Sequence, residues 1–184
     1  LVIGTFGRAA WVLDDITPLR VMANNNEILS SKIKLFKAPT AYLAAYQQPT
    51  GSRFGADAIF NGDNKEYGAR IMFYFTKNET NEELTEDKAL LKTGAHKDSI
   101  YLKIYDKDRL IRNLKRKVPD STGVYKWRWF MDEAGVRRPS RETRTITNEP
   151  GGTTVKPGVY NLVISHQNQK SMNTIEVKND PRIE

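Results

Sequence analysis

Cysteine is absent from this 184-residue sequence, and histidine occurs only twice, as His96 and His166. The absence of cysteine excludes disulfides, thiolate metal sites and cysteine nucleophiles. With two histidines, a zinc site would depend mainly on carboxylate ligands, which is uncommon. A histidine-based catalytic triad could use only one of these two residues as its general base. We therefore expect this chain to use no cofactor and no metal.

Long hydrophobic runs are also missing: none approaches the roughly 18 residues that a membrane-spanning helix needs, so we expect no membrane span. The chain opens in the strand-like run LVIGTFGRAAWVLDD, without a charged-then-apolar leader. Any export signal is therefore expected in sequence that precedes Leu1. An apolar fraction of 39% is sufficient for a packed core and too high for a disordered protein.

Acidic residues are few in one stretch of the chain. Residues 107–144 carry 12 Lys/Arg against 5 Asp/Glu and account for the whole net charge of +7. Basic residues interleaved with Trp127, Trp129 and Phe130 suit contacts to phosphates and stacking on bases. A strand with basic side chains on its solvent face and aromatic ones on its buried face explains the same pattern. We favour that explanation, so nucleic acid is not an expected partner.

Alternation of polar and apolar residues dominates the sequence and predicts strands. A strong apolar strand is predicted at ARIMFYF (69–75), and GVYKWRWFMD (123–132) places Tyr125, Trp127 and Trp129 on one face. Two hairpins are predicted, SIYLKIYD (99–106) with RLIRNLKR (109–116), and GVYNLVISH (158–166) with SMNTIEVK (171–178). Helical patterns are few, which favours an all-β fold of the sandwich type.

The N-terminal run resembles a segment of known proteins. GTFGRAAWVLDDITPLR (4–20) is similar to the closing segment of the BNR-repeat, sortilin-type β-propellers of exported bacterial proteins, which are often labelled glycosyl-hydrolase-like. The residues that carry this likeness are Gly4, Thr5, Gly7, Arg8, Trp11, Leu13, Asp14, Asp15 and Pro18. In such proteins a small immunoglobulin-like domain, akin to those of flagellar hook-capping proteins, follows the propeller. The Trp-bearing strand and the later VKPGVYNLVI resemble that domain.

The resemblance implies a domain organisation and a set of contacts. It implies the closing segment of a preceding β-propeller over 1–20, a linker and irregular loop region over 21–66, and an immunoglobulin-like β-sandwich over 67–184. It also implies an exported protein of the periplasm, outer envelope or extracellular space, whose partner is the preceding propeller in the same chain. The residues expected to pack at that interface are Arg8, Trp11, Leu13, Pro18 and Leu19.

Catalytic groups are not apparent in the sequence. Asp14 and Asp15 are adjacent, so on a strand they point to opposite faces, and Asp106 and Asp108 bracket a predicted turn. Neither pair is placed to flank a glycosidic bond. We expect a non-catalytic accessory domain that supports the propeller or mediates interaction.

Two alternatives to an accessory domain remain open. One is a carbohydrate-binding module, with Tyr125, Trp127 and Trp129 as an exposed aromatic platform; its partner would be a carbohydrate. The other is a part of a glycoside hydrolase whose catalytic residues lie outside this chain. An envelope protein is a further candidate partner for the accessory domain.

Overall fold

Strands make up most of the regular structure in the computed structural model, which describes residues 1–7, 9–44, 66–77, 99–137, 139, 141 and 149–183. In these ranges the prediction of an all-β fold is confirmed. The strands are β1 (Val2–Thr5), β2 (Ala9–Val12), β3 (Ile33–Leu35), β4 (Ala41–Leu43), β5 (Ala69–Phe75), β6 (Ser99–Asp106), β7 (Arg109–Lys117), β8 (Gly123–Trp129), β9 (Asp132–Ala134), β10 (Gly151–Thr154), β11 (Gly158–His166) and β12 (Gln169–Asn179). The helices are α1 (Thr17–Asn24) and α2 (Glu27–Ser30). Neither is long and apolar enough to cross a membrane, and the described residues include no other helix that could.

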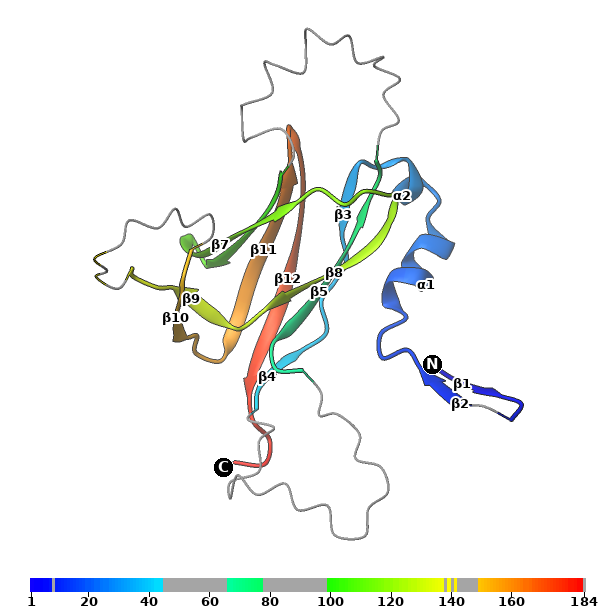
Figure 1. The fold of residues 1–184 in the computed structure, drawn as a ribbon, viewed down its shortest axis with the longest axis horizontal. Helices are drawn as coiled ribbons and strands as arrows, with labels where there is room; N and C mark the ends of the chain where they lie inside the picture. Colours follow the sequence, from blue (N-terminus) through cyan, green and yellow to red (C-terminus); the bar gives the residue numbers. More distant parts are fainter. Residues whose placement is uncertain are drawn as a thin grey trace, which may run out of the picture.

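Two sheets form the body of the molecule (Figure 1). The larger has the order β4-β12-β11-β6-β7, with β4 parallel to β12 and its other neighbouring strands antiparallel. The smaller has the order β3-β5-β8 and is antiparallel throughout. Two further pairs, β1 with β2 and β9 with β10, form separate two-stranded sheets.

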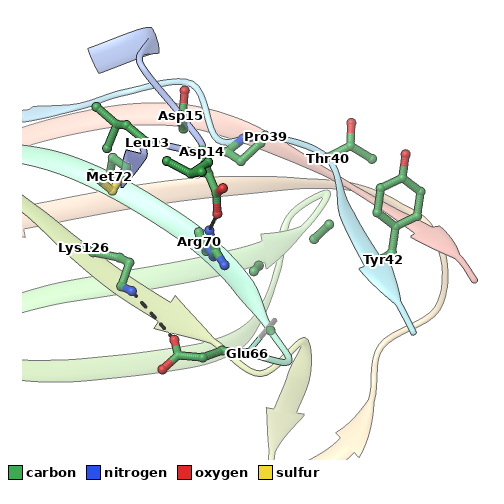
Figure 2. A pocket seen from close by; sticks show the side chains of 14 residues that line it. Leu13, Asp14, Asp15, Pro39, Thr40, Tyr42, Glu66, Arg70, Met72 and Lys126 are labelled. Atoms are coloured by element: carbon green, nitrogen blue, oxygen red, sulfur yellow. Dashed lines mark hydrogen bonds and ion pairs between the residues drawn. The ribbon is translucent and has the colours of Figure 1, made fainter. Parts of the chain in front are cut away.

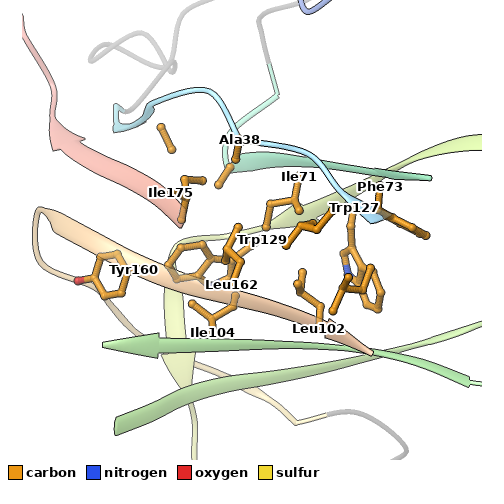
Figure 3. Packing of buried hydrophobic residues seen from close by; sticks show 14 of the residues in the cluster. Ala38, Ile71, Phe73, Leu102, Ile104, Trp127, Trp129, Tyr160, Leu162 and Ile175 are labelled. Atoms are coloured by element: carbon orange, nitrogen blue, oxygen red, sulfur yellow. The ribbon is translucent and has the colours of Figure 1, made fainter. Parts of the chain in front are cut away.

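The hydrophobic core lies between the two larger sheets (Figure 3). Ile71 and Phe73 of β5 face Leu102 of β6 and Leu162 of β11, and all four are fully buried. In β6 and β11 these side chains alternate with exposed or half-buried ones, as the period of two requires. In β5 they alternate with Met72 and Tyr74, which face a second apolar cluster on the other side of the sheet. Trp129 is also fully buried, and its indole Nε1 donates to the carbonyl oxygen of Asp132 at 2.9 Å. The donor of this large side chain is therefore satisfied inside the core.

Both predicted hairpins are confirmed. The β6–β7 pair turns at 107–108, where Lys107 has a φ of 55°. The β11–β12 pair turns at 167–168, where Gln167 has a φ of 52°. The second turn is shorter than the predicted four residues, because β12 begins at Gln169 and pairs with His166. Such tight turns match the right-handed twist of the strands they join.

The region 21–66, expected to be linker and loop, contributes regular structure within its described part. It contains α2 and the end of α1, and its strands β3 and β4 belong to the smaller and the larger sheet respectively. Pro18 lies in the first turn of α1, where its missing N–H breaks no helical hydrogen bond. Ile28 of α2 packs with Phe36 and Tyr74 in a second apolar cluster. The helices thus cover part of the outward face of the smaller sheet.

Candidate functional site

The β1–β2 hairpin exposes apolar side chains on both of its faces. Ile3 pairs with Trp11, and Val2 pairs with Val12 on the opposite face. The exposed fractions are 51% for Ile3, 66% for Trp11, 66% for Val2 and 65% for Val12. In Figure 1 the hairpin stands clear of the two larger sheets. Phe6, at its turn, is fully exposed, so the described structure leaves most of the hairpin uncovered.

The residues predicted to form an interface lie in or beside this hairpin. Trp11, Leu13 and Leu19 are exposed and available for contact. Pro18 is buried at the start of α1, so it packs within the chain instead. Arg8 lies outside the described residues. The exposed members lie on β2, directly after it and on α1, elements that Figure 1 places on one side of the molecule.

An ion pair holds the N-terminal segment against the smaller sheet. The Asp14 carboxylate contacts Nη1 of Arg70, which points outward from β5 (Figure 2). Asp15 is oriented by a 2.8 Å hydrogen bond from the backbone N–H of Thr17 to its Oδ1. The pair is partly exposed, so its contribution to stability is about 1 kcal/mol or less. The ion pair attaches the segment that follows the hairpin to β5 of the smaller sheet.

A pocket of about 320 Å³ surrounds this ion pair. Its walls come from residues 12–15, from residues 39–42 and from the outward side of the smaller sheet. The residues that line it on the smaller sheet, and in the turn that precedes β5, are Glu66, Gly68, Ala69, Arg70, Met72 and Lys126. Sequence reasoning missed it, although Arg70 in the otherwise apolar ARIMFYF was a signal. Such a residue must face outward and find an anionic partner.

The cations around this pocket are neutralised by acids of the same chain. Arg70 lies directly opposite Arg128 in the β5–β8 pairing, a like-charge arrangement that is unfavourable by itself. Asp14 faces Arg70, while Oε2 of Glu66 lies 3.3 Å from Nη1 of Arg128 and 3.7 Å from Nζ of Lys126. This balance suits the pocket to holding the N-terminal segment in place.

The aromatic residues considered as a ligand platform belong to the core. Trp127 is 8% exposed and Trp129 is 0% exposed, as the alternation in β8 predicted. Trp127 packs on Phe73, and Tyr125 is partly buried with its hydroxyl donating to the Ser121 carbonyl at 2.6 Å. The two indole rings therefore present no open face on which a sugar could stack.

A buried arginine joins β7 to the β9–β10 pair. Arg112 is 6% exposed; its Nη1 donates to the carbonyl oxygens of Pro150 and Glu133, and its Nη2 lies 3.5 Å from Oδ2 of Asp132. Burial raises the pKa of Asp132, and the nearby Arg112 partly opposes that rise. A perturbed carboxyl can mark an active site, but here its partners are structural: Arg112 of β7 and the turn between Trp129 and Asp132.

The acidic residues of the described chain do not form a metal site. Among the described residues, no three His, Asp or Glu side chains are grouped as metal ligands would be. Asp106 and Asp108 bracket the β6–β7 turn, as the sequence predicted, and Asp106 lies 3.8 Å from Nη2 of Arg109. Their positions fit a turn and an exposed ion pair.

Comparison with known proteins adds no relative. No protein-family model matches the chain, and neither a curated protein nor a solved structure is significantly similar to it.

Proposed function

We propose that this chain is a non-catalytic accessory module of an exported multidomain protein of the BNR-repeat, glycosyl-hydrolase-like type. In this proposal the N-terminal hairpin closes a preceding β-propeller, and an immunoglobulin-like sandwich supports that propeller from outside. The observation that carries it is the hairpin, whose two faces are both apolar and both exposed.

The two-sided apolar character of the hairpin has a physical explanation in this arrangement. A hairpin that packed on one side only would have an apolar face and a polar face. Each sheet of a propeller lies between two neighbouring blades, so both of its faces are buried. Val2 and Val12 would then contact one neighbour, and Ile3 and Trp11 the other.

The strand order of the two larger sheets supports the immunoglobulin-like part of the proposal. An immunoglobulin sandwich places strands A, B and E side by side in one sheet and C, F and G in the other. Here β3-β5-β8 corresponds to A-B-E, and β6-β11-β12 corresponds to C-F-G, with β7 in the position of an additional strand beside C. The chain order of these strands follows the same sequence of letters.

A hydrogen bond at the start of β11 also supports it. The hydroxyl of Tyr160 donates to the carbonyl oxygen of Lys156, four residues upstream, at 2.6 Å. This is the arrangement of the tyrosine corner, which in immunoglobulin-like sandwiches lies near the start of strand F. The core tryptophans depart from the antibody pattern, because they lie on β8 in place of strand C.

The proposal is tested by the fluorescence of Trp11. Trp11 is the exposed tryptophan of the three, since Trp127 and Trp129 are buried. In this chain, the fluorescence emission should contain a red-shifted component that acrylamide quenches and that disappears in the Trp11→Phe variant. In a longer protein that carries the preceding propeller, the same component should be blue-shifted and protected from acrylamide.

The Trp11→Phe variant of the longer protein is the matched control, because it assigns the change to this one side chain. A Trp11 signal that stays equally exposed in both proteins would overturn the proposal. So would preceding sequence without propeller repeats.

A further inference from the structure

The outward face of the larger sheet carries a set of lysines and tyrosines with no role in the proposal above. Along β6, Ile100, Leu102 and Ile104 point into the core, while Tyr101, Lys103 and Tyr105 point outward and are only partly buried. Across β12, β11, β6 and β7, the outward residues around these positions are Tyr101, Lys103, Tyr105, Leu110, Asn113, Lys115, Lys117, Asn161, Val163, Ser165, Lys170, Met172 and Thr174. We refer to this set as the outer face.

The strand register arranges the outer face in rows. Tyr101 lies between Lys115 of β7 and Ser165 of β11, and Ser165 is opposite Lys170 of β12. Lys103 is in the next row, between Asn113 and Val163. Neighbouring strands are about 4.8 Å apart, so Lys115 and Lys170 are separated by about 14 Å across three strand spacings.

The charge of the outer face has one sign. It holds Lys103, Lys115, Lys117 and Lys170 and no carboxylate. Glu176, the one acid that points outward from these four fully described strands, lies farther along β12. Its carboxylate accepts a hydrogen bond from the Thr40 hydroxyl at 3.1 Å and forms an ion pair with Nζ of Lys178 at 3.3 Å. At the β7 edge, Glu149 accepts a hydrogen bond from the backbone N–H of Asn113.

We propose that the outer face binds an acidic polysaccharide, through its lysines and the rings of Tyr101 and Tyr105. Lysines about 14 Å apart match charges spread along an extended chain better than one small anion. Lysine acts as a compact point charge and needs no bidentate geometry, so it suits carboxylates or sulfates at varied orientations. Asn161, Ser165 and Thr174 supply donors and acceptors for the hydroxyls of a sugar chain.

Nucleic acid fits the same surface less well. Arginine, whose fork matches phosphate, is missing from the outer face. Stacking of bases also requires open aromatic faces. Tyr101 and Tyr105 are partly buried, and Nζ of Lys115 lies 5.8 Å from the centroid of the Tyr101 ring. The surface better fits a pyranose whose edge contacts the partly covered ring of Tyr101 and whose carboxylate lies near Lys115.

The test measures binding of the whole chain to an oligogalacturonate by isothermal titration calorimetry. Its fully methyl-esterified form is the matched ligand control, because only the negative charges are removed. Dextran sulfate and unmodified dextran form a second pair, which distinguishes sulfate from carboxylate. We expect at least one acidic chain to bind at millimolar concentration or below, its uncharged counterpart not to bind, and the affinity to fall with added salt.

Variants locate the site. Lys103→Glu and Lys170→Glu should each weaken binding at least tenfold, and Tyr101→Ala should weaken it without changing the salt dependence. Lys34→Glu, on the smaller sheet, makes the same change in net charge and should leave binding unchanged. Thermal melting identifies any variant that fails to fold, in which case Lys115→Glu replaces it.

Three results would overturn the proposal: no binding of either acidic chain, equal binding of the uncharged chains, or equal weakening by Lys34→Glu. Tighter binding of single-stranded oligothymidylate, lost in the same outer-face variants, would assign the surface to nucleic acid instead. Each of these outcomes leaves the proposed role of the N-terminal hairpin unaffected, because that role does not use the outer face.

Discussion

The side chain of Arg112 stabilises the fold at the boundary of the core, where it connects β7 to β9 and β10. Its guanidinium is almost fully buried and contacts two carbonyl oxygens and the carboxylate of Asp132. Removing one partner of a buried pair leaves the other charge without compensation in a poorly solvated place. The sequence RLIRNLKR predicts a strand but does not indicate that this arginine points inward, because a bulge next to Ile104 changes the alternation in β7.

We therefore expect Arg112→Met to lower the free energy of unfolding by about 3–5 kcal/mol. The double variant Arg112→Met, Asp132→Asn should recover part of the loss, because the unpaired carboxylate is gone. Arg109→Met, which removes an exposed pair with Glu133, should cost clearly less. Urea denaturation measures all three, and a loss below about 1 kcal/mol for Arg112→Met would contradict the structural role given to it.

Asp180 gives a prediction about pH. Hydrogen bonds from the side chain and backbone N–H of Arg182 lower the pKa of this carboxyl to about 2. Because the folded-state pKa lies below the ordinary value of about 3.9, the ionised form stabilises the fold above that value. This stabilisation is lost as the pH falls from about 4 towards 2.

NMR titration of the Asp180 carboxyl should place its midpoint near 2, and Arg182→Gln should move the midpoint upward. The Asp180→Asn variant should lose less stability than the parent chain over the same acid range. A midpoint for Asp180 at the ordinary value would show that the contact with Arg182 does not persist in solution.

At the scale of elements, the start of β11 depends on Tyr160. Its ring packs against Trp129 with the ring centroids 5.6 Å apart, and its hydroxyl bonds back to Lys156. The Tyr160→Phe variant keeps the ring and removes the hydrogen bond. We expect a loss of about 0.5–1.5 kcal/mol in the free energy of unfolding.

Tyr101→Phe is the control for that substitution, because Tyr101 points outward from the core. It should change stability by less than about 0.5 kcal/mol. Equal effects of the two substitutions would contradict the role given to the Tyr160 hydroxyl.

The elements that sequence predicted best are those whose partners are near in the chain. The β6–β7 and β11–β12 hairpins follow from alternation and short turns, and the burial of Trp127 and Trp129 follows from the same alternation. Strand β4 was not predicted, because its partner β12 is more than 130 residues away and its three residues have no pattern of their own. The pocket around Arg70 was missed for the same reason, since its walls come from distant segments.

At the scale of the whole molecule, the described structure has a well-packed body and one uncovered hairpin. The body buries its large apolar residues between two sheets, as a stable domain requires. The β1–β2 hairpin contributes none of its side chains to that core and is joined to the body through α1 and the Asp14–Arg70 pair. An isolated two-stranded hairpin is marginally stable in water, and its free edges invite pairing with another strand.

Hydrogen exchange of the backbone amides of residues 2–7 and 9–12 tests this account most directly. In the chain alone, these amides should exchange rapidly, because the hairpin is exposed and opens easily. In a longer protein with the preceding propeller, they should become as slow as the amides of β11, since strand pairing and burial on both faces protect them. Equally rapid exchange in both proteins would contradict the claim that this hairpin belongs to a neighbouring propeller.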